Sequence, residues 1–177
     1  MSQSIPSRYH PIQVALHWLT VILVFAAFIV GKSMSRLPND DAKIAPLAIH
    51  MSIGILMLVV IVIRFIARLR LPKPAHATAG NVFFDLVGRV VHYALYAFVL
   101  LMTISGLSLS TQAGLAPIVF GGSGAPLPAD FFDFAARVLH GFIAPTLFLL
   151  ILLHVGAAFY HQWFIKDKLL SRMWYGK

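Results

Sequence analysis

The chain has no cysteine and few charged side chains. Only 11% of its 177 residues are Asp, Glu, Lys or Arg, whereas a soluble domain carries about 25%. The absence of cysteine excludes disulfides, thiolate metal sites and cysteine-held iron–sulfur clusters. Hydrophobic residues make up 59% of the chain, and its mean hydropathy is +0.84. Together with the scarcity of charge, this composition excludes an ordinary soluble enzyme, a disordered tail and a nucleic-acid-binding module.

Charge is missing altogether from four long stretches, 9–31, 44–63, 90–129 and 138–165. A membrane-spanning helix needs about 20 apolar residues. The third stretch is too long for one helix, and Gly106, Gly114 and Pro117 indicate that its helix ends near Leu109. The first is too long for a cleaved signal peptide. The sequence therefore predicts one all-α domain over residues 1–177, an integral membrane four-helix bundle with helices at about 10–31, 44–68, 83–109 and 134–163.

Basic residues are concentrated in the segments on the same side as the N-terminus. That side holds ten basic and two acidic residues, and the opposite side holds four of each. Because basic loops stay in the cytoplasm, both termini are expected there; this side is called inner and the other outer. The ten inner residues are Arg8, Arg64, Arg68, Arg70, Lys73, Arg89, Lys166, Lys168, Arg172 and Lys177.

Histidine is the most informative residue type, because several of its eight residues lie inside the apolar stretches. Ionisable groups within a bilayer are costly and usually functional. His140 and His154 are 14 residues apart on the last helix, which places them about 40° apart in rotation and roughly 21 Å apart in depth. His161, seven residues further, returns to the same face within about 20°. One face of this helix therefore presents imidazoles at several depths.

Partners exist at matching depths on other helices. His50 and His140 each follow the outer start of their helix by about six residues and can face each other near the outer leaflet. His17 can face His154 near the inner leaflet, and His92 lies at a similar inner depth, so the inner pairing stays open between these two residues.

Facing imidazoles in an apolar bundle suit the two axial positions of a haem iron. Two pairs at two depths predict two b-type haems stacked across the membrane. Interhelical hydrogen bonding is the alternative for single membrane histidines. Zinc prefers three or four ligands at one place, and proton relays tend to use Asp or Glu, which are absent from the helix centres.

Arginines and glycines surround the expected ligands. Arg137 and Arg64 lie near the histidine faces and can grip haem propionates, although arginines at helix ends also act as interfacial anchors. Glycine lets a macrocycle approach a helix closely, and ordinary small-residue packing is the alternative. The glycines in question are Gly54, Gly141 and Gly156.

Several sequence motifs resemble the bacterial cytochrome b561 family over nearly the whole chain. They are Tyr9-His10-Pro11, Leu16-His17-Trp18-Leu19, Ile49-His50-Met51-Ser52-Ile53-Gly54, Leu139-His140-Gly141, Leu153-His154-Val155-Gly156-Ala157 and the ending 161–173. The resemblance implies a four-helix membrane protein with two b haems, ligated by His17 with His154 and by His50 with His140. It also implies quinone as an electron partner, and some members resemble superoxide oxidases, which pass electrons from superoxide to ubiquinone.

The expected function is thus transmembrane electron transfer that exchanges electrons with quinone, with superoxide as a candidate donor at the outer face. Lys43 and Arg137 would attract this anion. His161 is the first candidate for the quinone site, with His92 and Arg89 as weaker ones. One alternative is a membrane-anchor cytochrome subunit that relays electrons for a dehydrogenase or hydrogenase. Another is a haem-free transporter.

Overall fold

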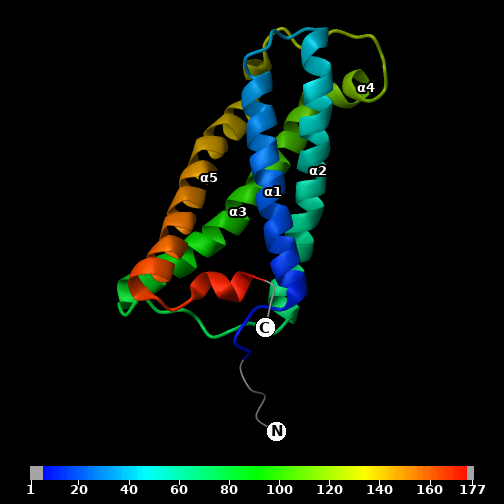
Figure 1. Ribbon diagram of the computed structural model, residues 1–177. Coiled ribbons are helices and arrows are strands. Elements are labelled where there is room, and N and C mark those ends of the chain that lie inside the picture. The colour runs from blue at the N-terminus through cyan, green and yellow to red at the C-terminus, as the bar shows by residue number, and fades with distance from the viewer. Residues whose placement is uncertain (1–5, 175–177) are drawn as a thin grey trace.

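The computed structural model describes residues 6–174, which form helices and connecting loops without any strand in that range. Four long helices are apolar enough to cross a membrane, α1 (Pro11–Met34), α2 (Asp41–Arg70), α3 (Val82–Gln112) and α5 (Ala135–Tyr160, with its apolar span continuing to Ile165). Figure 1 shows them side by side in one elongated bundle. The short elements are α4 (Leu115–Val119), η1 (Phe131–Asp133), η2 (His161–Ile165) and η3 (Leu169–Met173).

The helix ends of the structure differ from the predicted ones by at most three residues, at the ends of α1 and α5 as well as at the two positions described next. α2 begins at Asp41 because the Asp40 carboxylate accepts a hydrogen bond from the backbone N–H of Ala42 at 3.0 Å and caps the helix. α3 continues to Gln112, so the expected end near Leu109 was wrong. Gly106 lies inside this helix, where its lack of a side chain admits the ring of His140 from α5.

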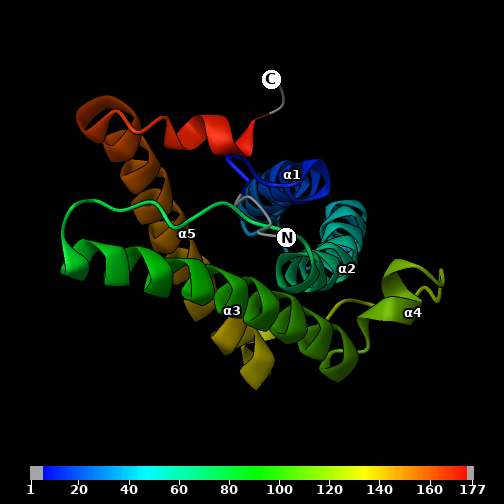
Figure 2. The same cartoon turned by 90° about the horizontal axis from the view of Figure 1, so that it is seen from below.

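The bundle consists of two helix hairpins that meet along α2 and α3. α1 packs on α2, α3 packs on α5, and α2 packs on α3. Seen from below in Figure 2, α1 and α2 stand together while α5 crosses α3 on the other side. Mid-depth side chains form the main apolar core, and Phe28 of α1 meets Phe148 of α5 with ring centroids 5.7 Å apart. The buried core residues are Leu23, Val24, Met57, Val60, Ile61, Val99 and Leu147.

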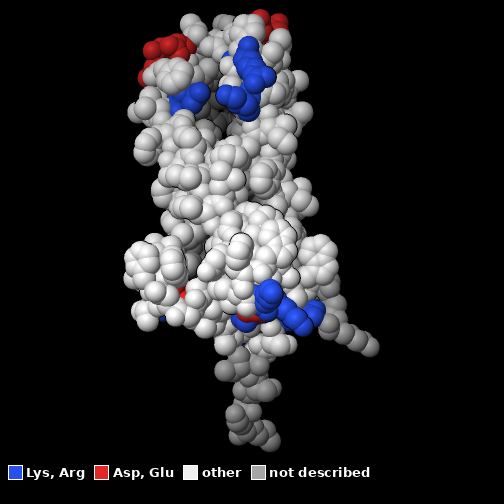
Figure 3. Space-filling view, turned by 60° about the vertical axis from the view of Figure 1, so that its left-hand side comes forward, with Lys and Arg blue, Asp and Glu red and all other residues white. Residues whose placement is uncertain are grey.

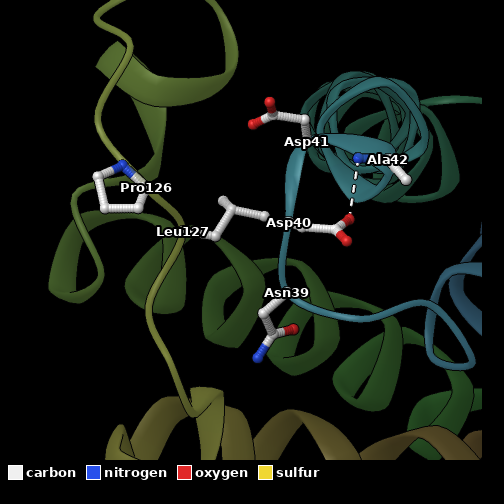
Figure 4. A pocket seen from close by; sticks show the side chains of 6 residues that line it. All are labelled: Asn39, Asp40, Asp41, Ala42, Pro126 and Leu127. Atoms are coloured by element: carbon white, nitrogen blue, oxygen red, sulfur yellow. Dashed lines mark hydrogen bonds between the residues drawn. The ribbon is translucent and has the colours of Figure 1, made fainter.

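A separate cap covers the outer end of the bundle. Leu115 of α4 and Leu127 of the following loop pack on Leu47 of α2 in a second small core. Beside it, a shallow pocket opens between the start of α2 and the loop at Pro126 and Leu127 (Figure 4). Its polar lining is Asn39, Asp40 and Asp41, so it includes none of the expected site residues.

The chain after α5 returns beneath the bundle to α1, so the start of α1 and the segment 169–174 lie at the same end (Figures 1 and 2). The indole Nε1–H of Trp18 donates to the carbonyl oxygen of Met173 at 2.9 Å, and the backbone N–H of Tyr9 donates to that of Arg172 at 3.2 Å. The Arg172 guanidinium donates to the carbonyl oxygen of Ala75 at 3.0 Å. This return segment ties three parts of the chain together. Lys177 of the charge analysis lies outside the described residues.

The Trp18 hydrogen bond is expected to hold the return segment in place. Trp18→Phe keeps an aromatic ring and removes one bond worth about 1 kcal/mol, or roughly fivefold in the local opening equilibrium. Amide hydrogen exchange of residues 169–174 should accelerate by about that factor. Trp163→Phe is the matched control, because Trp163 is exposed and stacks only on Phe159. Unchanged exchange in Trp18→Phe would show that this bond does not anchor the segment.

Candidate functional site

Four histidines lie in two facing pairs at two depths of the bundle. His17 of α1 faces His154 of α5 toward the inner end, with ring centroids 6.3 Å apart. His50 of α2 faces His140 of α5 toward the outer end, with ring centroids 6.2 Å apart. All four residues are half-buried. The structure therefore brings together the outer pair that the depth argument indicated, and it brings His17 to His154, one of the two inner pairings that this argument left open.

His92, the competitor for the inner pairing, is placed differently. Its ring centroid lies 5.0 Å from that of His154, the residue is exposed, and its Nδ1–H donates to the Gly88 carbonyl oxygen at 2.6 Å. The inner end therefore holds a triplet of rings in which His154 contacts both His17 and His92.

The ring spacings can be compared with the geometry of a metal held between two imidazoles. A metal–imidazole bond is about 2.0 Å, and a ring nitrogen lies about 1.1 Å from the centroid of a five-membered ring with bonds of about 1.3 Å. Two such bonds in line separate the centroids by about 6.2 Å. His17–His154 and His50–His140 fit this value, whereas His92–His154 is about 1 Å too short.

The donor set favours haem over a bare metal ion. Within residues 6–174, no group of three or more His, Cys, Asp or Glu side chains could hold a metal ion. Zinc takes three or four protein ligands at one place. In haem, the macrocycle supplies the other iron ligands and leaves two axial positions for facing histidines. The residues present thus fit this cofactor.

Two glycines lie where a side chain would crowd the outer histidine rings. We call these two positions, Gly31 and Gly106, the glycine seats. A Cβ atom at Gly31 of α1 would lie 3.1 Å from Cε1 of His50, and one at Gly106 of α3 would lie 3.2 Å from Cε1 of His140. The sequence analysis missed Gly31 and used Gly106 as a helix-end signal. Neither seat could be identified without knowing which helix faces each ring.

The glycines that the sequence did single out have other surroundings. A Cβ at Gly141 would lie 2.8 Å from Nη1 of Arg137, so this glycine makes room for the guanidinium. At Gly54 and Gly156 a Cβ would meet no atom within 4 Å. They are compatible with the close approach of a flat ligand or with ordinary helix packing.

Arg64 reaches into the inner site without a carboxylate partner among the described residues. Its Nη2 donates to Nδ1 of His17 at 2.7 Å, and its guanidinium lies 5.3 Å from the ring centroid of Tyr96. No Asp or Glu carboxylate among the described residues forms a salt bridge with it. A guanidinium held in an apolar bundle is costly unless an anion compensates it, and a haem propionate would supply that charge.

Cations also gather at the outer end. Arg137 lies with its guanidinium 4.7 Å from the ring centroid of Phe132. Lys43 is buried at 9% exposure, and its Nζ donates to Oδ1 of Asn39 at 2.5 Å. Figure 3 shows Lys and Arg side chains around a hollow near this end, and others at the inner end beyond an uncharged middle band.

The residues expected to serve quinone do not form one cluster. Nδ1 of His161 lies 2.8 Å from Oδ2 of Asp167. Asp167 was not among the site residues expected from the sequence. Arg89 is exposed on α3. His92 contacts His154 instead of His161.

Ser105 of α3 is a second polar residue that the sequence analysis missed. Its Oγ lies 3.0 Å from Nδ1 of His140, and the residue is 3% exposed. A serine in an apolar helix gives no signal in the sequence, because only the packing of α3 on α5 brings it to the histidine.

Comparison with known proteins agrees with this arrangement. A family model described as prokaryotic cytochrome b561 matches residues 8–176. Cytochrome b561 homolog 2 of Escherichia coli (strain K12) is 34% identical over 177 residues, covering 95% of this chain and 92% of that protein. A probable superoxide oxidase, CybB, of Yersinia pestis is 27% identical over 168 residues, covering 94% and 95%. Cytochrome b562 of Cereibacter sphaeroides is 29% identical over 170 residues, covering 93% and 94%.

Four membrane-capable helices and these matches define a multi-pass bacterial membrane protein of electron transfer. The chain belongs to the prokaryotic cytochrome b561 family, in which b-type haem is the bound cofactor. The haem-free transporter considered from the sequence does not agree with this membership.

The glycine seats lead to a direct prediction. Gly106→Ala and Gly31→Ala should each lower the b-type haem bound per chain, because the added Cβ pushes a histidine ring away from its partner. The pyridine haemochrome assay on purified protein measures this ratio. Gly88→Ala is the control, since a Cβ at Gly88 meets no atom within 4 Å. An unchanged ratio in both variants would contradict the role of the seats.

Proposed function

We propose that the chain is a two-haem transmembrane electron carrier, with one b-type haem held by His17 and His154 and one by His50 and His140. The observation that carries this proposal is the centroid separation of 6.3 Å and 6.2 Å in the two pairs, which is what two axial bonds require. The spacing also favours His17 over His92 as the inner partner of His154.

Arg64 and Arg137 are proposed to hold the propionates. Arg64 lies at the inner pair with its positive charge uncompensated by any carboxylate of residues 6–174. Arg137 lies one helical turn before His140, next to Gly141. A guanidinium can grip a carboxylate through two hydrogen bonds, so each site would match a cation to an anionic edge of the cofactor.

The two axial histidines at each site decide the type of chemistry. Bound b-type haem supplies reversible one-electron oxidation and reduction of its iron. If each haem were held by two histidines, no position on the iron would remain for oxygen activation. The chain's own residues would then hold the cofactors and separate the two sites by depth, which is what an electron carrier across a membrane needs.

Replacing single histidines tests the two-site assignment. His140→Ala and His154→Ala should each lose about half of the haem, because each removes one axial ligand that holds the cofactor. His17→Ala should match His154→Ala, whereas His92→Ala should keep both haems. The measurement is a reduced-minus-oxidised visible spectrum with a haem-to-protein ratio. His10→Ala, at the start of α1, is a control that should lose none.

A single haem in the wild type, or full retention in His140→Ala, would overturn the two-site proposal. Equal losses in His92→Ala and His154→Ala, with none in His17→Ala, would transfer the inner pairing to His92. Each result is distinguishable from misfolding by the elution profile of the purified protein.

We further propose superoxide as the outer donor and quinone, with ubiquinone as the first candidate, as the inner acceptor. Two superoxide ions release two electrons and become two molecules of O₂, and a quinone that takes up these electrons and two protons becomes quinol. The CybB relative is named as a probable superoxide oxidase, and Lys43 and Arg137 provide positive charge at the outer end. The proposed location is the bacterial inner membrane, with lipid around the apolar helix faces.

At the inner end, His161 is the proposed quinone partner, with His92 and Arg89 as further candidates. If Nδ1–H of His161 donates to Asp167, its Nε2 is left to exchange a proton with a quinone oxygen.

The alternative function, a membrane-anchor subunit for a dehydrogenase or hydrogenase, predicts a stable protein partner. Copurification of such a subunit from native membranes would favour it. Reduction of quinone by superoxide with the purified chain alone would favour the proposed oxidase.

Removal of an outer cation tests the attraction of superoxide. Arg137→Ala should slow superoxide-driven haem reduction at low ionic strength by about tenfold, the lower range of electrostatic steering. The deficit should shrink as salt screens the field. Arg36→Ala removes an equal charge from an exposed outer position and should have a smaller effect. An unchanged rate and salt dependence in Arg137→Ala would refute the attraction, and a colourless variant would show that Arg137 is needed to retain haem.

A further inference from the structure

The hydroxyl group of Ser105 contacts two groups at once. Oγ lies 3.0 Å from the carbonyl oxygen of Met102, in its own helix, and 3.0 Å from Nδ1 of His140 on α5. With 3% of its surface exposed, Ser105 is shielded from bulk solvent.

Only one placement of the hydrogen atoms satisfies both of these hydrogen bonds. A carbonyl oxygen can only accept, and a hydroxyl group has one hydrogen to donate. The Ser105 hydrogen therefore goes to Met102, and Oγ must accept from His140. Nδ1 of His140 then carries its proton, and Nε2 keeps the free electron pair that a metal ligand requires.

The backbone of α3 fixes the ring as well as its proton. A Cβ atom at Gly106, which follows Ser105, would lie 3.2 Å from Cε1 of His140, so the missing side chain leaves room for the ring. Ser105 and Gly106 thus hold the ring from adjacent positions on one helix.

We propose that Ser105 is a positioning residue for the outer haem. It holds His140 in the Nδ1–H tautomer, presents Nε2 to the iron and lowers the reduction potential of that haem. A hydrogen-bond acceptor on the far nitrogen of a metal-bound histidine makes the ring a stronger electron donor, which favours the oxidised iron. This inference rests on the proposed two-haem function and adds a residue to its outer site.

At the inner site, the hydrogen bond to the corresponding ring nitrogen runs in the opposite direction. Nδ1 of His17 meets the guanidinium of Arg64, which can only donate. Among the described residues, neither His50 nor His154 has a hydrogen bond to a serine or threonine hydroxyl. A change at Ser105 is therefore expected to act on the outer haem and to leave the inner haem unchanged.

Redox titration of the haem-loaded protein tests the proposal. In Ser105→Ala, the outer haem should show a ratio of reduced to oxidised iron up to about tenfold higher at a fixed ambient potential, which corresponds to an upward shift of about 59 mV for one electron. The component of the titration curve that belongs to the outer haem is the one that is missing in His140→Ala. The inner component should keep its potential.

Two further variants separate positioning from packing. Ser105→Thr retains the hydroxyl and should restore the wild-type potential. Ser110→Ala makes the same change at another buried serine of α3, which has no hydrogen bond to a described histidine, and should change neither potential. If Ser105→Ala loses the outer haem, its return in Ser105→Thr supports the proposal and its continued absence overturns it.

Unchanged potentials in Ser105→Ala, with both components still assigned by the histidine variants, would overturn the role of Ser105 and leave the two-haem function standing. If His140→Ala and His154→Ala fail to remove separate components, the two-haem function itself fails.

Discussion

Facing imidazole rings in an apolar bundle need partners for their nitrogens, because lipid offers none. α5 provides one ring at each level, and α1 and α2 provide the other two. The separations of 6.3 Å and 6.2 Å exceed hydrogen-bonding contact between the rings and match two axial bonds to one iron. Gly31 and Gly106 lie against the outer rings, and Arg64 contacts the inner ring of His17.

The packing of the helices explains how the distance is kept. The hairpins α1–α2 and α3–α5 each pack tightly, and they join along α2 and α3. α1 meets α5 through the rings of His17 with His154 and of Phe28 with Phe148. The apolar core lies at mid-depth, between the two levels of histidines. This core fixes both levels in one rigid unit while keeping them apart in depth.

The two ends of the bundle offer different chemistry. The outer end carries the α4 cap, the glycine seats, Lys43 and Arg137. The inner end carries Arg64 in direct contact with His17, together with the return segment and the pair of His161 with Asp167. A protein that exchanges different partners at its two faces requires such an asymmetry. Cations lie close to both histidine levels, as expected for sites that hold an anionic macrocycle.

The sequence by itself determined the four membrane helices, because lengths of uncharged chain are set by the thickness of the bilayer. It also indicated histidines at two matching depths, with the inner partner left open between His17 and His92, because helical rise and rotation convert residue spacing into depth and face. Only the tertiary structure decided which groups surround each ring. Ser105, Gly31 and Gly106 lie on helices other than those that carry the rings they contact, and no periodicity within one helix reveals what packs against it. The spacing of His92 likewise allowed an inner pairing, and its short distance to His154 was decided by how α3 crosses α5.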